Sequence, residues 1–151
     1  MKCAIVGLGK VGMLFDSDSK RQGIWTHFRS YELLKSEGFE LVAVCDPDPK
    51  KLEIAKQRQN DLRTYSNLGD LLKEEKIDII TLASPTDLHA KQLLQCAGKV
   101  RGIFCEKPLA MNFLDAAEAE KVCREKNTFL AVNYYKRWDL NFPVAKKMVM
   151  E

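Results

Sequence analysis

Short apolar runs alternate along the chain with longer segments in which apolar and polar residues are mixed at helical spacing. The apolar runs are rich in β-branched residues and end at glycine, proline or polar residues, as strands buried on both faces do. Six runs predict strands, at residues 3–6, 39–45, 63–65, 77–83, 100–105 and 128–133. Helices are expected between them at 26–37, 50–59, 67–75, 86–97 and 112–126.

This order predicts an α/β fold on a parallel sheet that helices cover on both faces. Right-handed crossovers leave a doubly wound sheet of about six strands, the Rossmann fold with order 3-2-1-4-5-6, as the simplest topology. Thr86 is expected to cap the helix 86–97, and Gly98 to end it. Asn141 and Pro143 resemble the start of another helix that continues to Glu151.

Composition narrows the class of protein. With 151 residues the chain fits one domain, and 46% hydrophobic with 30% charged residues is typical of a globular protein. The net charge of +3 is small and the charges are interleaved, so nucleic acid is not an expected partner. No apolar run reaches the ~18 residues that a membrane span needs, so no membrane association is expected.

The five cysteines stand at 3, 45, 96, 105 and 123, and no two form a C-x-x-C pair. Neither a disulfide framework nor a metal site is therefore indicated. Most of these cysteines lie in apolar runs, where buried reduced thiols are expected. The cysteines thus indicate a reducing compartment, the cytoplasm.

A glycine-rich loop directly follows the first predicted strand. Gly7-Leu8-Gly9-Lys10-Val11-Gly12 matches G-x-G-x-x-G, the dinucleotide-binding pattern, in the structural context that the pattern requires. Gly7 permits a tight turn, Gly9 lets backbone N–H groups approach a pyrophosphate, and Gly12 lets helix and strand pack closely. The alternative is a glycine turn with a purely structural role.

The spacing after this loop is unusual, because Gly12 and Asp46 are 34 positions apart instead of ~20. The polar, poorly periodic stretch 15–24 accounts for the excess, and we interpret it as an insertion after a short first helical turn. It either overhangs the cofactor or substrate or is a plain surface loop.

Asp46 ends the second predicted strand, where its carboxylate can accept hydrogen bonds from an adenosine ribose diol and repel a 2′-phosphate. NAD is therefore favoured over NADP as the cofactor, although Lys50 and Lys51 keep NADP open. The alternative role of Asp46 is a helix cap or an Asx turn before Pro47.

Two further groups of polar residues follow predicted strands. The fourth strand is followed by Ser84-Pro85-Thr86 and then His89, which are expected in the ligand crevice of a doubly wound sheet. The alternatives are that Thr86 is only a helix cap and that His89 is a surface residue of the helix. Glu106-Lys107-Pro108 follows the fifth strand and sets an ammonium at the crevice rim, where it can bind a substrate oxygen or transfer a proton. By itself, Lys107 is better explained as a surface lysine in a turn.

These groups, in this order and followed by Asn133 and Arg137-Trp138, resemble the N-terminal half of the Gfo/Idh/MocA oxidoreductases, the glucose–fructose oxidoreductase and inositol dehydrogenase family. The resemblance covers essentially the whole chain, and Glu-Lys-Pro is its most specific part. It implies an NAD(P)-binding Rossmann domain that acts with a C-terminal α/β domain. It also implies oxidation or reduction of a hydroxyl-bearing carbon on a sugar, sugar nucleotide or cyclitol.

The resemblance makes Lys107 the catalytic residue, beside the nicotinamide and the reacting hydroxyl. It brings Glu106 to the nicotinamide ribose, and it implies a cis peptide bond before Pro108. The expected cofactor-binding residues are Gly7, Leu8, Gly9, Lys10, Val11, Gly12, Asp46, Ser84, Pro85, Thr86, His89, Glu106, Lys107, Pro108, Asn133 and Arg137.

Residues 1–138 are thus expected to form the dinucleotide-binding domain, and 139–151 to begin a connecting helix toward a C-terminal substrate domain absent from this sequence. The favoured interpretation is a part of a dehydrogenase that binds cofactor without turning over alone, and that forms a homo-oligomer at full length. A standalone dinucleotide-binding sensor or regulatory module is the alternative. A methyltransferase that uses S-adenosylmethionine is disfavoured by Glu-Lys-Pro and by the glycine pattern.

Overall fold

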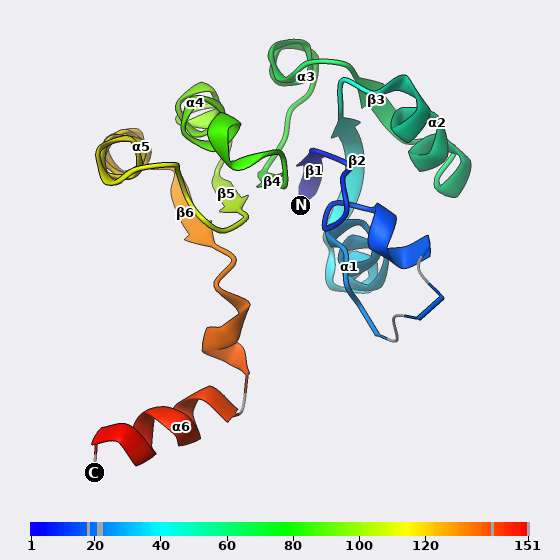
Figure 1. Cartoon of the computed structure of the whole chain (residues 1–151). Coiled ribbons are helices and arrows are strands. Elements are labelled where there is room, and N and C mark those ends of the chain that lie inside the picture. The colour runs from blue at the N-terminus through cyan, green and yellow to red at the C-terminus, as the bar shows by residue number, and fades with distance from the viewer. Residues whose placement is uncertain (18, 21–22, 140, 151) are drawn as a thin grey trace.

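Six parallel strands form one sheet in the computed structural model of the chain, which describes residues 1–17, 19–20, 23–139 and 141–150 (Figure 1). The sheet order is β3-β2-β1-β4-β5-β6, and each neighbouring pair is parallel, so the predicted Rossmann topology is confirmed. The strands are β1 (Lys2–Val6), β2 (Glu40–Cys45), β3 (Arg63–Tyr65), β4 (Ile79–Leu82), β5 (Gly102–Cys105) and β6 (Phe129–Val132).

Helices follow almost every strand, near the predicted positions. They are α1 (His27–Leu34), α2 (Pro49–Arg58), α3 (Leu68–Glu74), α4 (Thr86–Cys96), α5 (Phe113–Glu125) and α6 (Asn141–Met150), with 3-10 turns η1 (Leu14–Ser17), η2 (Lys35–Glu37) and η3 (Tyr135–Trp138). Asn67 caps α3 and Asn112 caps α5 through 2.9 Å side-chain bonds to backbone N–H groups. The prediction that Thr86 caps α4 is wrong, because Pro85 occupies the cap position and makes no side-chain bond there.

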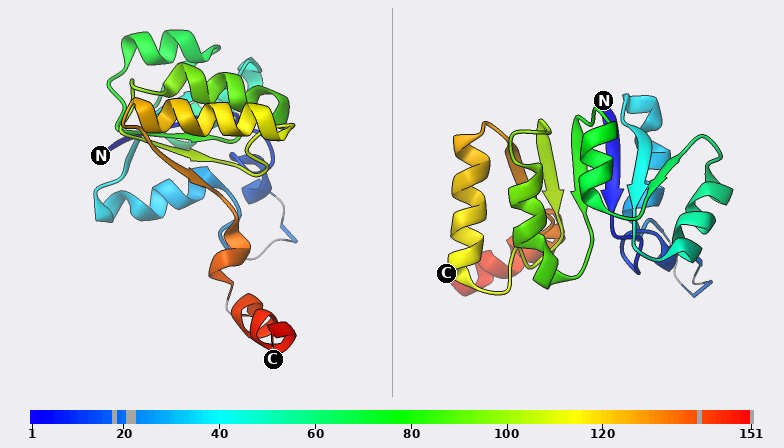
Figure 2. Two further views of the ribbon diagram at one scale, coloured as in Figure 1. Left: turned by 90° about the vertical axis from the view of Figure 1, so that its left-hand side faces the viewer. Right: turned by 90° about the horizontal axis from the view of Figure 1, so that it is seen from above.

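Alternate residues of the strands supply two separate cores. On one face, Ala4 and Val6 of β1 belong to the core beneath α3, α4 and α5. On the other face, Cys3 and Ile5 pack with residues of α1 and α2. Figure 2 shows α3, α4 and α5 together above the sheet and α1 below it.

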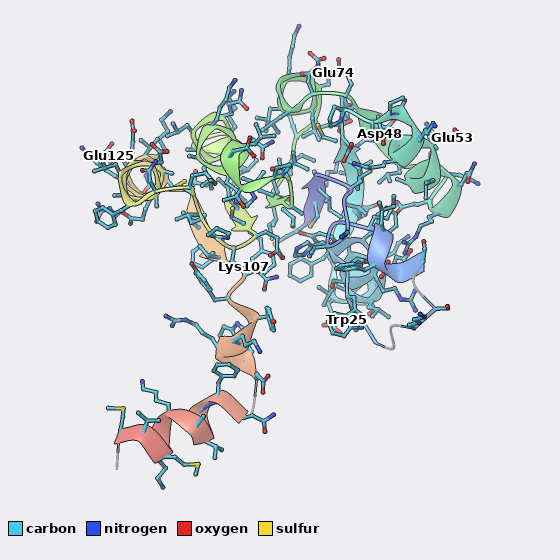
Figure 3. All side chains as sticks on the ribbon, viewed as in Figure 1. Trp25, Asp48, Glu53, Glu74, Lys107 and Glu125 are labelled. Atoms are coloured by element: carbon cyan, nitrogen blue, oxygen red, sulfur yellow. The ribbon has the colours of Figure 1, made fainter. Side chains whose placement is uncertain are left out.

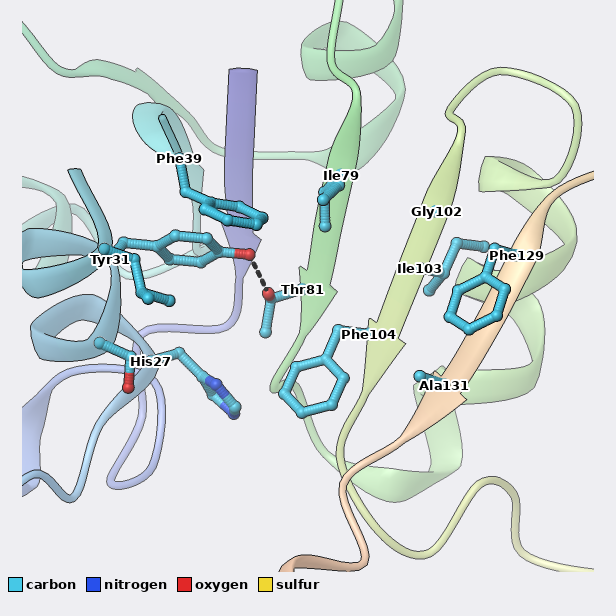
Figure 4. Close-up of a pocket in the computed structure, with 12 residues that line it drawn as sticks. His27, Tyr31, Phe39, Ile79, Thr81, Gly102, Ile103, Phe104, Phe129 and Ala131 are labelled. Carbon is cyan, nitrogen blue, oxygen red and sulfur yellow. Dashed lines mark hydrogen bonds between the residues drawn. The ribbon is translucent and has the colours of Figure 1, made fainter. Parts of the chain in front are cut away.

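The second face of the sheet is open beside α1, over β4, β5 and β6 (Figure 4). The hollow there measures about 410 Å³, and Phe104 and Phe129 line it, with the Phe129 side chain 73% exposed. A 2.8 Å hydrogen bond between the Tyr31 hydroxyl and Thr81 Oγ1 marks its border with α1. Helix α1 reaches β4 through Tyr31 and β5 through the ring contact of His27 with Phe104. The predicted helical cover of the second face is therefore incomplete beyond α1, where the described residues leave the hollow open toward Phe129 of β6.

The C-terminal segment leaves the sheet after β6, and α6 lies away from the body of the domain (Figures 1 and 2). Helix α6 begins at Asn141 itself, whose backbone N–H donates to Asp139 Oδ1 at 2.9 Å. The predicted connecting segment 139–151 also contains Leu140 and Glu151, which lie outside the described residues. Among the described helices, none combines the length and the apolar character that crossing a bilayer requires.

Candidate functional site

The glycine loop closes tightly over the ends of β1 and β4. Gly7 has φ +91°, and a Cβ built there would lie 2.5 Å from the backbone nitrogen of Ser84. A Cβ on Gly12 would lie 2.0 Å from the Gly7 carbonyl oxygen, whereas one on Gly9 would meet nothing within 4 Å. Gly7 and Gly12 are thus required by the fold, while Gly9 leaves open space in which a bulky anion can approach the backbone.

Helix α1 continues the glycine loop across a looped-out segment. The N–H groups of His27 and Phe28 donate at 3.0 Å to the carbonyls of Val11 and Gly12. In an uninterrupted helix the partners of these carbonyls would be residues 15 and 16, so the chain loops out 27 − 15 = 12 residues. Subtracting 12 from the 34 positions between Gly12 and Asp46 leaves 22, close to the usual ~20.

The insertion predicted at 15–24 therefore lies between Gly12 and His27, and its positions 18, 21 and 22 fall outside the described residues. Its two ends are joined, because Thr26 Oγ1 donates to Asp16 Oδ2 at 2.6 Å. Arg58 of α2 donates to the same oxygen at 2.9 Å, and Thr26 also caps α1. This junction holds the inserted segment against the N-terminus of α1.

Asp46 is buried directly after β2 and bonds to the glycine loop. Its Oδ2 accepts from the Leu8 N–H at 2.7 Å, and its Oδ1 accepts from the Asp48 N–H at 2.9 Å. Lys51 Nζ lies 3.2 Å from both oxygens. The Asx turn considered for Asp46 is present in this geometry, and the carboxylate retains lone pairs for a further donor.

Glu106, directly after β5, is the centre of a buried polar cluster. Its Oε1 lies 2.8 Å from His27 Nε2 and 2.6 Å from Asn133 Nδ2, and its Oε2 accepts from the Lys107 N–H at 3.2 Å. Burial alone would raise the pKa of Glu106, but the bonds from His27 and Asn133 outweigh it and lower the pKa. Because an ionised carboxylate only accepts, Nε2 of His27 is the donor in this pair.

His89 is fully buried and joins two of the predicted groups. Its Nε2 lies 2.9 Å from the Ser84 carbonyl oxygen, and its Nδ1 lies 2.8 Å from the Pro108 carbonyl oxygen. The alternative of a surface histidine is therefore wrong, because the ring bridges the segments after β4 and β5. The peptide bond before Pro108 is cis, as the resemblance implies.

Three adjoining hollows form one trough along the carboxyl edge of the sheet. The Asp46 hollow, about 520 Å³, lies between Asp46 and Asn67, and the glycine-loop hollow, about 380 Å³, runs from Gly9 to Lys107. The Trp25 hollow, about 360 Å³, continues beyond Lys107 toward the inserted segment. The first two share Asp46, Lys51 and three other residues; the last two share Val11, Glu106 and Lys107.

Twelve of the sixteen predicted cofactor-binding residues line this trough, namely Gly7, Gly9, Lys10, Val11, Asp46, Ser84, Pro85, Thr86, His89, Glu106, Lys107 and Asn133. Leu8, Gly12 and Pro108 lie behind it and support it through backbone contacts. Arg137 lies in η3, outside the residues that line the three hollows. The Lys107 ammonium makes no hydrogen bond or ion pair with any described residue, so it is free to meet a ligand.

Sequence reasoning missed two partners of these groups. His27 is 79 positions from Glu106, and the insertion hides its spacing from the glycine loop. Lys51 was noted only as a contact for NADP, whereas it pairs with Asp46.

The cysteines are core residues, and of the five Cys45 also lines the Asp46 hollow. All five are free and buried, and burial raises the pKa of Cys45, Cys96 and Cys105 to about 12. Their thiols are therefore protonated at neutral pH, as core residues are.

Comparison with known proteins agrees with this geometry. Residues 1–134 match the profile of the Gfo/Idh/MocA family, described as an oxidoreductase family with an NAD-binding Rossmann fold. Myo-inositol 2-dehydrogenase of Thermotoga maritima is 23% identical over 149 residues, which are 99% of this chain and 40% of that protein.

Solved structures are similar over the same part of the chain. Myo-inositol 2-dehydrogenase of Lactobacillus plantarum has a TM-score of 0.79 and 31% identity, covering 99% of this chain and 40% of that one. The WlbA dehydrogenase of Bordetella pertussis, solved with NADH and UDP-GlcNAcA, has a TM-score of 0.78 and 27% identity, covering 99% and 41%. The chain thus spans about 40% of the length of these relatives.

Proposed function

The chain belongs to the Gfo/Idh/MocA oxidoreductase family with its NAD-binding Rossmann fold, and we propose that it supplies the cofactor-binding part of an NAD-dependent dehydrogenase. The full-length enzyme transfers hydride between nicotinamide and a hydroxyl-bearing carbon of a sugar, sugar nucleotide or cyclitol. The observation that carries this proposal is the trough that runs without interruption from Asp46 past Gly9 to Lys107.

An extended dinucleotide fits the order of groups along this trough. Asp46 would accept hydrogen bonds from the adenosine ribose, and its negative charge disfavours the 2′-phosphate of NADP. The open space at Gly9 would take the pyrophosphate against backbone N–H groups. Glu106 and Lys107 would flank the nicotinamide end, where bound NAD supplies the hydride acceptor.

Lys107 would act on the substrate at its Nζ. The ammonium is held at the trough beside the buried Glu106 cluster and is free of described partners. There it can bind the reacting oxygen and take or return its proton. His27 and Asn133 would act as positioning residues, because they bond to Glu106 and hold the start of the Glu-Lys-Pro turn in place.

The substrate class rests on relatives. The names of the similar proteins include myo-inositol 2-dehydrogenases and a dehydrogenase solved with a sugar nucleotide. Hydroxyl-rich rings are common to these compounds, which supports a sugar-like substrate for this chain.

We further propose that residues 1–138 form the cofactor domain, that 139–151 begin a connection to a substrate domain, and that the complete enzyme is a homo-oligomer. The open apolar face over β4–β6 and the 40% share of the relatives' length support a larger protein. The five free cysteines support a cytoplasmic location. On this proposal the isolated chain binds cofactor but does not turn over, since most substrate contacts lie elsewhere.

The proposal is tested by titrating NADH into the chain while following nicotinamide fluorescence and thermal stability. We expect saturable binding, tighter for NADH than for NADPH, and no reduction of NAD with myo-inositol or UDP-sugars. Absence of binding by NAD(H) and NADP(H) at millimolar concentration would refute the cofactor assignment. Turnover by the isolated chain would refute the assignment of the missing substrate domain.

A further inference from the structure

The two edges of the sheet differ in how they are protected. Strands β3 and β6 lie at opposite ends of the sheet (Figure 1). Edge strand β3 has three residues, and its exposed Arg63 bonds to Glu75. Edge strand β6 is Phe-Leu-Ala-Val, without charge or proline, and its register with β5 is regular. Native sheets protect their edges with short strands, charges or bulges, so an apolar, regular edge such as β6 is a site for pairing with another strand.

Alternate residues of β6 turn their backbone groups away from the sheet. The N–H groups of Phe129 and Asn133 donate at 2.9 and 2.8 Å to carbonyls of the β5 segment. In a parallel ladder the residues between them direct both backbone groups to the other side, so those of Leu130 and the Val132 N–H point outward. Among the described residues, none bonds to these outward groups.

These outward groups match a second copy of the same strand. Two antiparallel β6 strands related by a two-fold axis at Leu130 bring the outward groups of the two Leu130 residues opposite each other, where they exchange a pair of hydrogen bonds. The same register sets each Val132 N–H opposite the Thr128 carbonyl of the other copy, which adds one bond per copy. The Thr128 N–H and the Val132 carbonyl are not needed there, because they bond within their own chain.

The side chains of β6 fit the same register. Phe129 is 73% exposed and lies beside Gly102 of β5, where a built Cβ would be 4.0 Å from the Phe129 Cβ. On its outer side Phe129 would face Ala131 of the second copy, since the residue before the axis lies opposite the residue after it. The large ring is thus flanked by a small residue on each side, and Leu130 pairs with Leu130 on the face below α5.

Helix α5 provides charge complementarity across the same axis. Residues 113–120 carry three acidic residues and no basic one, whereas residues 121–126 carry three basic residues and one acidic. A two-fold axis sets the two α5 helices antiparallel, so the acidic half of each faces the basic half of the other. Glu120 and Arg124 are both exposed and lie 3.7 Å apart near the middle of this pattern. This self-complementarity favours a second copy over a strand of another protein.

We propose that the β6 edge is an interface between two copies of this chain, with antiparallel β6 strands at its centre and the two α5 helices beside them. The two sheets join into one, and the two troughs lie on opposite edges of it. No residue of β6 lines a trough, so the cofactor path stays open in the dimer. The inference gives the homo-oligomer of the proposed function an interface, and it does not depend on the cofactor assignment.

Sedimentation velocity of the whole chain over a roughly hundredfold range of concentration tests the inference. We expect a reversible equilibrium between monomer and dimer. Hydrogen exchange followed by NMR at both ends of this range should show the N–H groups of Leu130 and Val132 protected only in the dimer. Phe129→Lys places a charge at the centre of the joint and should weaken dimerisation about tenfold or more. Its monomer should fold, because the Phe129 side chain is mostly exposed in a single copy.

Charge reversal on α5 tests the second part of the interface. Glu120→Arg should weaken dimerisation about fivefold, because it meets Arg124 of the other copy. The double variant Glu120→Arg with Arg124→Glu should restore the dimer to within about twofold, since the pair is complementary again. Glu53→Arg is the matched control, because it makes the same charge change on exposed α2, and Figure 3 shows Glu53 and Glu125 of α5 on opposite sides of the molecule. It should leave dimerisation unchanged.

Three outcomes would overturn the inference. They are a chain that stays monomeric at every concentration, a dimer in which the Leu130 N–H exchanges as fast as in the monomer, and a dimer that Phe129→Lys does not weaken. NADH titration separates this inference from the proposed function. NADH binding by a chain that stays monomeric would overturn the interface and leave the cofactor assignment standing, whereas a dimer with these properties that binds no NADH would do the reverse.

Discussion

Replacing Asp46 separates its support of the glycine loop from its proposed selection of NAD. The Asp46→Ala variant removes the acceptor of the buried Leu8 N–H and of the Asp48 N–H, together with the partner of Lys51. A buried donor left without an acceptor costs about 1–3 kcal/mol. The loss of the two less buried bonds adds about 1 kcal/mol.

We therefore expect the free energy of unfolding to fall by about 2–4 kcal/mol. For a chain of this size each kcal/mol lowers Tm by about 2–4 °C, so the expected decrease is on the order of 10 °C. Asp46→Asn retains one acceptor oxygen, which can still bond to the Leu8 N–H, and should lose roughly half as much.

Both variants should also narrow the preference for NAD over NADP. The neutral side chain no longer repels a 2′-phosphate, and Lys51 loses the carboxylate that now lies 3.2 Å from its ammonium. The measurements are thermal unfolding without ligand and titrations with NADH and NADPH under the same salt conditions. A full loss of Tm with an unchanged NADH/NADPH ratio would show that Asp46 only supports the loop. An unchanged Tm would refute the energies assigned to its hydrogen bonds.

Three further substitutions test other parts of the site. Gly9→Ala should leave Tm nearly unchanged, because the Cβ of the new alanine meets nothing within 4 Å. The same Cβ would occupy the space proposed for the pyrophosphate, so NADH binding should weaken at least tenfold. An unchanged NADH affinity would contradict the proposed position of the pyrophosphate. Glu106→Gln should make the free energy of unfolding depend less on pH in the acid range. The lowered pKa of Glu106 stabilises the fold above about pH 4.5, and this contribution is lost as pH falls through the folded pKa. Parallel Tm–pH curves for variant and wild type would contradict this. His89→Ala should cost about 1–3 kcal/mol, because the carbonyl oxygen of Ser84 or of Pro108 that accepts the ring N–H loses its buried donor. A denaturant midpoint equal to that of wild type would reject this role of His89.

The sequence alone determined the order of elements, the sheet topology and most of the trough. Strand and helix periodicity, glycine at a turn with positive φ, and right-handed crossovers are local or topological rules that need no coordinates. Because the carboxyl ends of parallel strands meet at one edge, Asp46, Ser84 and Glu106 could be assigned to one site before any distance was known. The Lys107 ammonium was assigned to the rim of that site by the same rule.

Only the tertiary structure decided which groups bond across this edge and which faces stay open. The pairing of His27 with Glu106 joins positions 79 apart, and it depends on an insertion that loops out without displacing α1. The open face over β4–β6 depends on which strands α1 covers, since periodicity shows that a strand face is apolar but not what packs on it. Long-range contacts of this kind depend on how the loops close in space, which local pattern does not encode.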